Sequence, residues 1–373
     1  MKFLTVLVCP INAVGHVNAC LGTVSGLLRR GHQVIFVVEA AWAGKLMTPN
    51  GQQQHGVTEH LYSAPLQAGK QTADMLATIF LDIGLIGPFT ARQKALNLLK
   101  FFDCDHLREE WTYYDAAIKA AISRYNPDVI LTDENGLMPA IHHSGLPWIR
   151  HISTNPLFFE LEEDLPPGGS GLPLHDRSGW ADFNEVRGEY IYSKVFNDFI
   201  QGLGYPRYPS DIKTPRTAAL TVYACPEEWN YPPLRAKADW FNLEVFNKKT
   251  PKKRVTPLEA VLPQSFLNEH LDGKFSGKYI YVSLGSMGSI DLELMQRLLS
   301  ALVHSPHKYI VSKGPLHDQY QVAGRNQWGD RFLPQLDILP QVNLVITHGG
   351  NNSVTEIFAQ GKPCIVVPLF ADQ

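Results

Sequence analysis

Short runs of apolar residues alternate with amphipathic segments along most of this chain, and this alternation limits the fold more than any other feature. The first run covers residues 3–9, a helix is expected over 18–30, and a second strand over 33–38. Continuous apolar runs of this length are typical of strands that are buried on both faces of a parallel sheet. Strands that alternate with helices predict a doubly wound α/β fold.

The same pattern appears again later in the chain. Further strands are expected over 128–132, 147–151, 279–284, 309–312, 344–347 and 364–368, with helices over 111–124, from Asp291 onward and over 354–360. A chain of 373 residues is long for a single core. We therefore predict two α/β domains, over 1–239 and 278–373, joined by a linker over 240–277 that is rich in Lys, Pro and Asn.

Composition excludes several classes of protein. The net charge is −3, which gives no electrostatic reason to expect a nucleic-acid partner. The five cysteines are scattered, odd in number and never spaced as C-x-x-C. This argues against a disulfide framework and against a structural zinc site. We therefore expect no metal and a reducing, cytoplasmic setting.

The N-terminal apolar run is open to two interpretations. Lys2 followed by the apolar residues 3–9 has the form of a short signal peptide. The run passes directly into a turn and an amphipathic stretch, which favours a strand. No run of about 18 apolar residues occurs, so the sequence predicts no membrane-spanning helix within residues 1–373.

Two residues of the first half follow predicted strands. His16 is expected in the loop after the first strand, and Asp133 comes directly after the strand 128–132. Ligands of open α/β sheets bind outside the carboxyl ends of the strands, so the two side chains are expected to meet. A histidine oriented by a carboxylate is a general base. The alternative is a polar loop histidine beside an aspartate that caps a helix.

A glycine-rich turn follows the strand 344–347. His348-Gly349-Gly350 leads into a helix expected to open near Ser353, a layout in which backbone N–H groups and the helix dipole bind an anion. Ser353 and Glu356 also form the S-x-x-E pattern of a capping box. Glu356 therefore has a purely structural interpretation beside the ligand-binding one.

Familiar cofactor motifs do not occur. No G-x-G-x-x-G follows the first strand and there is no Walker A sequence, so neither a dinucleotide nor any other cofactor is expected. Asp103-Cys104-Asp105 has the D-x-D form that some metal-dependent sugar transferases use. It lies in a helical, aromatic context, and we interpret it as a chance match.

The segment 332–373 resembles the nucleotide-sugar signature of the UDP-glycosyltransferases of glycosyltransferase family 1. The matching strings are Phe-Leu-Pro-Gln ending at Gln335, Thr-His-Gly-Gly-Asn-Asn-Ser-Val-Thr-Glu ending at Glu356, Gly-Lys-Pro, and Pro-Leu-Phe-Ala-Asp-Gln ending at Gln373. The Gly15-His16 loop, the strand end at Asp133 and the Ser-Leu-Gly-Ser string ending at Ser286 match as well. The chain looks most like the soluble bacterial, plant and arthropod members.

This resemblance implies a GT-B fold, in which two Rossmann-like domains face each other across a cleft. The N-terminal domain would bind the acceptor, with His16 as catalytic base and Asp133 as its partner. The C-terminal domain would bind the UDP-sugar. The matching positions assign Ser286, His348, Gly349, Gly350, Asn352 and Ser353 to the phosphates, Phe332 and Gln335 to uracil, Glu356 to the ribose, and Asp372 and Gln373 to the sugar.

The expected reaction is metal-independent transfer of a hexose, expected to be glucose, from a UDP-sugar to a small lipophilic alcohol or phenol, with inversion. UDP-sugar is then a co-substrate, and no membrane or nucleic-acid partner is expected. Some aromatic residues of the first half are candidates to line the acceptor site, although most are expected in the core. They are Phe80, Phe89, Phe101, Phe102, Trp111, Phe158, Phe159 and Trp180.

Two departures from the family pattern leave alternatives open. Phe332 stands where many members have tryptophan, which reduces the area for stacking on uracil. Family members continue past the position of Gln373, so the second domain is expected to be incomplete. One alternative is a truncated, catalytically inactive fragment that binds nucleotide sugars. The other is a GT-B relative such as a UDP-sugar 2-epimerase or a lipid-linked sugar transferase, which Gln335, Glu356 and Asp372-Gln373 together disfavour.

Overall fold

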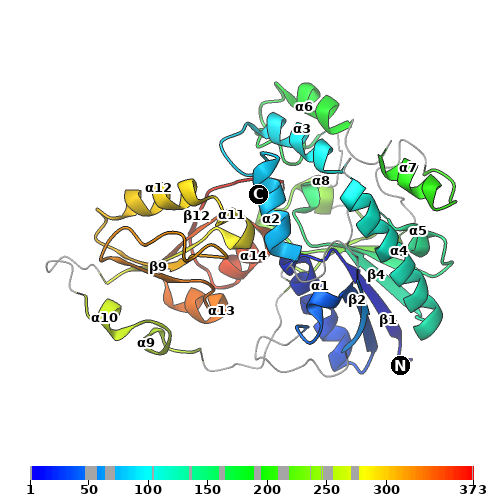
Figure 1. Ribbon diagram of the computed structural model, residues 1–373, viewed down its shortest axis with the longest axis horizontal. Coiled ribbons are helices and arrows are strands. Elements are labelled where there is room, and N and C mark those ends of the chain that lie inside the picture. Colours follow the sequence, from blue (N-terminus) through cyan, green and yellow to red (C-terminus); the bar gives the residue numbers. More distant parts are fainter. Residues whose placement is uncertain are drawn as a thin grey trace. The chain divides into compact units, whose positions relative to one another are not determined.

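The computed structural model in Figure 1 describes most of the chain. The described residues are 2–46, 57–63, 72–102, 105–133, 137–158, 164–188, 195–208, 218–235, 237–244, 246, 255–269, 277–371 and 373. The chain divides into two compact units. The first unit comprises residues 1–72 and 90–248, and the second comprises residues 73–89 and 249–373.

The first unit is built on a seven-stranded parallel sheet with the strand order β3-β2-β1-β4-β5-β6-β7. Its strands are β1 (Thr5–Pro10), β2 (Gln33–Glu39), β3 (Val57–Tyr62), β4 (Val129–Asp133), β5 (Trp148–Ile152), β6 (Leu220–Tyr223) and β7 (Trp240–Asn242). The chain order reverses between β1 and β4, which is the switch point where ligands of doubly wound sheets bind.

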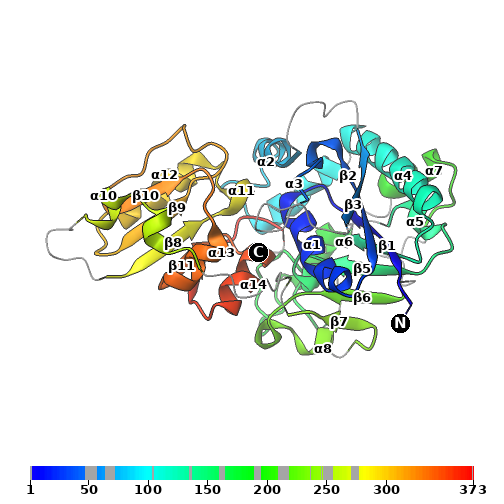
Figure 2. The same ribbon diagram turned by 90° about the horizontal axis from the view of Figure 1, so that it is seen from below.

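Helices cover both faces of this sheet, as Figure 2 shows. They are α1 (Val14–Arg29), α3 (Ala91–Phe102), α4 (Asp105–Tyr125), α5 (Pro139–His142), α6 (Trp180–Gly188), α7 (Val195–Gly202) and α8 (Pro232–Arg235), with short 3-10 helices η1 (Ala40–Trp42), η3 (Pro156–Phe158) and η4 (Glu227–Trp229).

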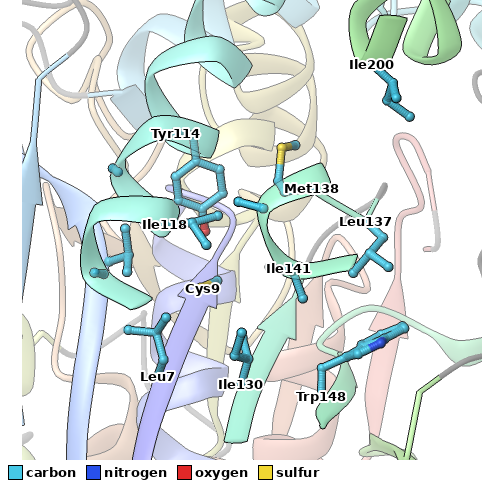
Figure 3. Packing of buried hydrophobic residues seen from close by; sticks show 14 of the residues in the cluster. Leu7, Cys9, Tyr114, Ile118, Ile130, Leu137, Met138, Ile141, Trp148 and Ile200 are labelled. Carbon is cyan, nitrogen blue, oxygen red and sulfur yellow. The ribbon is translucent and has the colours of Figure 1, made fainter. Parts of the chain in front are cut away.

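Alternate residues of each central strand point to opposite faces of the sheet, so both faces need an apolar cover. Leu7 and Cys9 of β1 belong to the same buried cluster as Tyr114 and Ile118 of α4, as Figure 3 shows. Val8, which lies between them in β1, packs with Leu21 of α1 on the other face. This alternation explains why the strands appear in the sequence as unbroken apolar runs.

The second unit has a five-stranded parallel sheet in the order β10-β9-β8-β11-β12. Its strands are β8 (Tyr279–Ser283), β9 (Lys308–Ser312), β10 (Gln327–Asp330), β11 (Leu344–Thr347) and β12 (Cys364–Val366). The order reverses between β8 and β11, which repeats the arrangement of the first sheet. Its helices are α9 (Leu258–Val261), α10 (Gln264–Leu267), α11 (Gly285–Gly288), α12 (Leu292–Leu302), α13 (Gln335–Ile338) and α14 (Asn351–Ala359), with the 3-10 helix η5 (Leu339–Gln341).

The predicted domain boundaries need correction at two places. The segment 240–277 is not a single linker, because β7 pairs with β6 of the first sheet. By contrast, α10 belongs to the second unit. The ammonium group of Lys308 in β9 donates hydrogen bonds to the carbonyls of Phe266 and Leu267 in α10. Residues 73–89, including most of α2 (Thr72–Asp82), also belong to the second unit, where the Phe80 and Phe370 rings meet edge to face.

Element boundaries agree with the sequence patterns to within a few residues in most cases. The strand predicted over 344–347 has those bounds, and Asp291 is the N-cap of α12, accepting from the Leu294 amide. The helices α1 and α14 begin earlier than predicted, at Val14 and Asn351. Among the described residues, no helix is both long and apolar enough to cross a membrane.

One glycine of α1 is required by packing. A Cβ atom at Gly22 would lie 2.2 Å from the carbonyl oxygen of Phe246. We expect Gly22→Ala to reduce the free energy of unfolding of the first unit by about 1–3 kcal/mol, because a backbone atom must move.

Gly26, in the same helix, is the matched control, because a Cβ atom there would meet only the end of the Arg29 side chain, at 3.9 Å. Gly26→Ala should stabilise the helix by about 0.5–1 kcal/mol. Denaturant unfolding of both variants checks the prediction, and equal effects would contradict it.

Candidate functional site

The first group of candidate residues gathers at the switch point of the first sheet. Strands β1 and β4 are neighbours, with Pro10 opposite Asp133. His16 lies in the first turn of α1, not in a loop as the sequence suggested, because the helix already begins at Val14. Asp133 is the last residue of β4. The carboxyl ends of two adjacent parallel strands thus bring together residues that are 117 positions apart in the chain.

His16 and Asp133 are in direct contact, as the sequence predicted. The Nδ1 atom of His16 lies 3.0 Å from Oδ2 of Asp133 and 2.7 Å from Oγ of Ser153. A carboxylate can only accept at this distance, so the contact favours the tautomer with the proton on Nδ1. Nε2 then carries the lone pair. The His16 side chain is 22% exposed and the Asp133 side chain 5% exposed. This is the geometry of a general base held by a buried carboxylate.

Asp133 is held as an anion by its neighbours. Burial is the largest single influence and would raise its pKa, but the charges and hydrogen bonds of His16 and His151 together outweigh burial, so the pKa lies below its usual range. The Ser153 amide donates to Oδ1 over 3.2 Å, and Nδ1 of His151 lies 3.7 Å from the same oxygen. The carboxylate therefore carries its charge in the folded protein.

Four residues around this pair were missed by the sequence analysis. His151 and Ser153 lie at the end of β5, the strand next to β4, and Cys20 and Thr23 lie on α1. His151 carries a signal that could have been used, because it belongs to a strand end on the same edge as Asp133. Cys20 follows His16 by four positions and so shares its helix face.

Cys20, Asp133 and His151 form a compact buried cluster. One possible ligand atom from each residue lies within 4.8 Å of the others. The sequence led us to expect no metal site, because the cysteines follow no metal-binding spacing. Such a cluster is invisible to spacing rules, because each of its three residues comes from a different element.

In the second unit, His348 follows β11 and its ring lies between two glycines. A Cβ at Gly285 would lie 2.7 Å from Cε1 of His348, and a Cβ at Gly350 would lie 2.6 Å from its Nε2. Real side-chain carbons do not approach so closely. Gly285 also has a positive φ of 69°, which disfavours other residues. Both glycines are therefore needed for His348 to occupy its position.

The His348 imidazole is neutral at physiological pH. Burial lowers its pKa to about 4, and only the Ser283 backbone opposes this shift. No described residue pairs with its buried Nδ1 atom. A neutral imidazole can donate one hydrogen bond to an anion and needs no counter-charge in the folded protein.

Helix α14 begins directly after the turn His348-Gly349-Gly350. Its N-cap is Gly350, and no side chain caps it. Asn352 and Ser353 lie in the first turn, where backbone N–H groups and the helix dipole favour an anion. The capping-box interpretation of Ser353 and Glu356 is wrong, because Ser353 is the third residue of the helix and not its cap. Glu356 therefore has no structural role of that kind.

Glu356 is held by a different partner. Nε2 of Gln335, the first residue of α13, donates to Oε2 of Glu356 over 2.7 Å and lies 3.4 Å from Oγ of Ser353. Three predicted donor-site residues thus form one cluster. Phe332 lies three residues before α13, is 57% exposed and has the Arg331 guanidinium over its ring at 5.3 Å. Its ring is an accessible stacking surface.

Three predicted residues of the second unit remain to be placed: Ser286, Gln373 and Asp372. Ser286 lies in α11 after β8, the neighbour of β11. Gln373 lies beside Gly349, 3.5 Å from the position of a Cβ there, and its Oε1 accepts from the Leu369 amide over 2.8 Å. Asp372 lies outside the described residues. The structure therefore gathers most predicted residues of the second unit around the carboxyl ends of β8 and β11.

Comparison with known proteins gives a family match in the second half of the chain. The family model described as "UDP-glucoronosyl and UDP-glucosyl transferase" matches residues 271–373. UDP-glucuronosyltransferase 3A1 of Bos taurus is 35% identical over 123 residues, which cover 31% of this chain and 23% of that relative. The 2-hydroxyacylsphingosine 1-beta-galactosyltransferase of Homo sapiens is 22% identical over 387 residues, which cover 98% of this chain and 66% of that relative. The chain thus spans less than two thirds of either relative.

Solved structures resemble nearly the whole chain. The calicheamicin glycosyltransferase CalG4 aligns with a TM-score of 0.59 at 17% identity, covering 98% of this chain and 80% of its own. The Arabidopsis thaliana protein UGT89C1, complexed with UDP-L-rhamnose, aligns with a TM-score of 0.55 at 16% identity, covering 99% and 80%. At these identities the likeness shows the fold, which is the two-domain Rossmann-like GT-B fold of glycosyltransferases.

The neutral His348, whose Nδ1 atom is buried, makes stability depend on pH. Its pKa is 6.5 when unfolded and about 4 when folded. Its neutral form therefore supports folding above pH 6.5, and this support is lost as the pH falls toward 4. As the pH falls from 6.5 to 4, we expect the unfolding free energy of the parent to fall by up to about 3 kcal/mol more than that of His348→Gln.

Urea unfolding at a series of pH values measures this difference. The control is His304→Gln, because His304 is an exposed histidine of the same unit. Its difference from the parent should stay constant over the same interval. A constant difference for His348→Gln as well would mean that His348 is not held neutral.

Proposed function

We propose that this chain is a UDP-glycosyltransferase of glycosyltransferase family 1 and that it transfers a hexose from a UDP-sugar to a hydroxyl group of a small lipophilic acceptor, with inversion at the anomeric carbon. The observation that carries the proposal is the contact between His16 and the buried Asp133 at the switch point of the first sheet. The family match and the relatives' printed activities support the donor class.

In the proposed mechanism the first unit activates the acceptor. Nε2 of His16 accepts the proton of the acceptor hydroxyl, and Asp133 stabilises the resulting imidazolium. The acceptor oxygen then forms a bond to the anomeric carbon while the bond from that carbon to the UDP oxygen breaks. Attack opposite the leaving group inverts the configuration. His16 needs to be partly exposed for this role, and it is.

The second unit is proposed to bind the donor and to stabilise the departing diphosphate. The diphosphate would lie at the N-terminus of α14, where the amides of the Gly349-Gly350 turn, the side chains of Asn352 and Ser353, and neutral His348 donate hydrogen bonds. Ser286 would contact the phosphates from α11. These groups need no metal ion to bind the diphosphate.

The uridine part would be bound by the cluster around α13. Glu356 would accept hydrogen bonds from the ribose hydroxyls, Gln335 would contact uracil and position Glu356, and the exposed ring of Phe332 would stack on the base. Asp372 and Gln373 would bind the sugar hydroxyls. The relatives' names include glucuronosyl, glucosyl and galactosyl transfer, which supports a hexose. Glucose remains our specific proposal.

The acceptor is the least constrained part of the proposal. Several aromatic residues of the first half belong to cores: Phe101 and Trp180 are buried, and Trp111 packs against the cluster that contains Phe196. They are therefore poor candidates for contacts with an acceptor. The galactosyltransferase relative is named for 2-hydroxyacylsphingosine, which supports a lipophilic alcohol as the acceptor here.

Replacement of the base should separate transfer from binding. We expect His16→Ala to reduce the rate of transfer from UDP-glucose to a simple phenol by about 10²–10⁴-fold, since general base catalysis is worth that much. The affinity for UDP should not change, because His16 lies in the other unit. His175→Ala is the control, as His175 is an exposed histidine of the first unit. Undiminished transfer by His16→Ala would refute the proposed base. If the parent protein binds UDP but transfers no sugar, the result would favour the alternative of a nucleotide-sugar-binding protein without catalytic activity.

Glu356→Gln tests the donor site. The carboxylate is replaced by an amide that accepts weaker hydrogen bonds, so we expect UDP affinity to fall about 10–100-fold, which corresponds to about 1.5–3 kcal/mol. The melting temperature should change little, because Glu356 caps no helix. Glu293→Gln on the exposed face of α12 is the matched control. Calorimetric titration with UDP and thermal melts measure both quantities. Unchanged affinity together with a lower melting temperature would make Glu356 a structural residue only.

A further inference from the structure

The buried cluster behind His16 has the composition and geometry of a metal site. The Sγ atom of Cys20 lies 3.8 Å from Nδ1 of His151 and 4.0 Å from Oδ2 of Asp133, and Nδ1 of His151 lies 3.7 Å from Oδ1 of Asp133. Thiolate, imidazole and carboxylate are the three ligand types that Zn²⁺ uses in proteins. The two contacts of the thiol lie within hydrogen-bond range for sulfur, so the same three groups are near enough to share either protons or a metal ion.

The distances fit a tetrahedral ion. Ordinary Zn–S, Zn–N and Zn–O bonds at tetrahedral angles place neighbouring ligand atoms about 3.4–3.6 Å apart. The contact of the Cys20 thiol with Nδ1 of His151 exceeds its ideal value by about 0.2 Å. Asp133 faces the thiol with Oδ2 and the imidazole with Oδ1, so its carboxylate must turn to place one oxygen on the ion. Three protein ligands leave one position of the ion for a water molecule, as in catalytic and exchangeable zinc sites.

The surroundings of the cluster orient two of its ligands. Nε2 of His151 lies 2.9 Å from Oγ1 of Thr23, so an N–H at Nε2 that donates to this hydroxyl leaves the lone pair of Nδ1 for a metal. The His151 ring is also held by Phe246, with ring centroids 4.8 Å apart. The Ser153 amide donates to Oδ1 of Asp133. Ligands fixed in this way are pre-organised for binding.

We propose that Cys20, Asp133 and His151 form a site for a thiophilic divalent cation of the Zn²⁺ class, whose binding takes Asp133 away from His16. The Cys20 thiol releases its proton to solvent as the Sγ–metal bond forms. With its carboxylate coordinated, His16 loses the partner that orients it and stabilises its protonated form. The ion would therefore inhibit transfer reversibly. This consequence rests on the proposed function, whereas the binding site itself does not.

The chemistry of the ligands also predicts selectivity. Mg²⁺ and Ca²⁺ require several oxygen ligands, and this cluster supplies one carboxylate beside two softer donors. Co²⁺ is a suitable spectroscopic substitute, because it accepts the ligands and geometry of Zn²⁺ and reports a bound thiolate by a charge-transfer absorption band. We expect Co²⁺ and Zn²⁺ to compete for one site and Mg²⁺ not to compete.

Titration of the full chain, free of any histidine tag and stripped with a chelator, tests the site. We expect one equivalent of Co²⁺ to produce the thiolate charge-transfer band, and one equivalent of Zn²⁺ to abolish it. Cys20→Ser should remove the band, and His151→Gln should weaken binding at least tenfold. Thr23→Val, which removes no ligand, should weaken binding about 10-fold through His151. Cys225→Ala is the control: Cys225 is another buried cysteine of the first unit and should leave the band intact.

Several results would overturn the metal site. They are Co²⁺ binding without a thiolate band, which indicates surface histidines only, a band that persists in Cys20→Ser, and a band that Cys225→Ala abolishes. Circular dichroism and thermal melts identify any variant that fails to fold, and Thr23→Val then keeps the test decisive. Titration with UDP, which reports on the second unit, tests the proposed function separately. If Zn²⁺ binds as expected but leaves transfer unchanged, the inhibitory role is refuted while the site stands.

Discussion

The requirement that a parallel sheet be covered on both faces organises each unit of this protein. Side chains of adjacent strand positions point to opposite sides, so Leu7 needs the cover of α4 while Val8 needs that of α1. Helices must therefore cross from one strand to the next above or below the sheet. The carboxyl ends of the strands remain as the places where loops and helix starts converge. At the position where the chain order reverses, the connections that follow the two neighbouring strands run to opposite faces of the sheet. This leaves a crevice at the strand ends, where polar groups can lie outside the apolar core.

Both units use this position, with opposite electrostatic character. At the β1–β4 switch point the buried carboxylate of Asp133 is an anion that favours a protonated His16. At the β8–β11 switch point the buried group is a neutral imidazole beside the N-terminus of α14. The first arrangement suits removal of a proton, and the second suits binding of an anion. Under the proposed function these are the two demands of glycosyl transfer: a base for the acceptor and donors for the diphosphate.

Sequence patterns predicted the elements that carry a strong local signal. The strand 344–347 was located to the residue because an apolar run ends at a glycine-rich turn, and Asp291 was recognisable as the start of a helix. The start of α1 was misplaced because Gly15 resembles a turn, whereas packing of the helix on the sheet overrides its low helix propensity. β7 was missed because it is only three residues long and the Lys- and Pro-rich residues after it suggested a linker, and only pairing with β6 makes it a strand.

The candidate sites divide in the same way. Residues in one contiguous segment, such as His348 and Glu356, could be found from their order along the chain. The contact of His16 with Asp133 followed from a general rule about strand ends. Nothing local marks Ser153, whereas His151 ends a predicted strand. Both become neighbours of Asp133 only through the pairing of β4 with β5. Long-range contacts of this kind are a product of topology, so single-sequence patterns do not reveal them.

Asp133 links the catalytic and the metal-binding proposals, because one buried carboxylate has neighbours on two sides. His16 contacts Oδ2 from the partly exposed side, and His151 approaches Oδ1 from the fully buried side. A single anion cannot satisfy a protonated imidazole and a divalent cation equally, since each lowers the affinity of the carboxylate for the other. The two proposed uses of the carboxylate therefore oppose each other. The geometry that would make His16 a base is also what would make it sensitive to any cation that the thiol and second imidazole can hold.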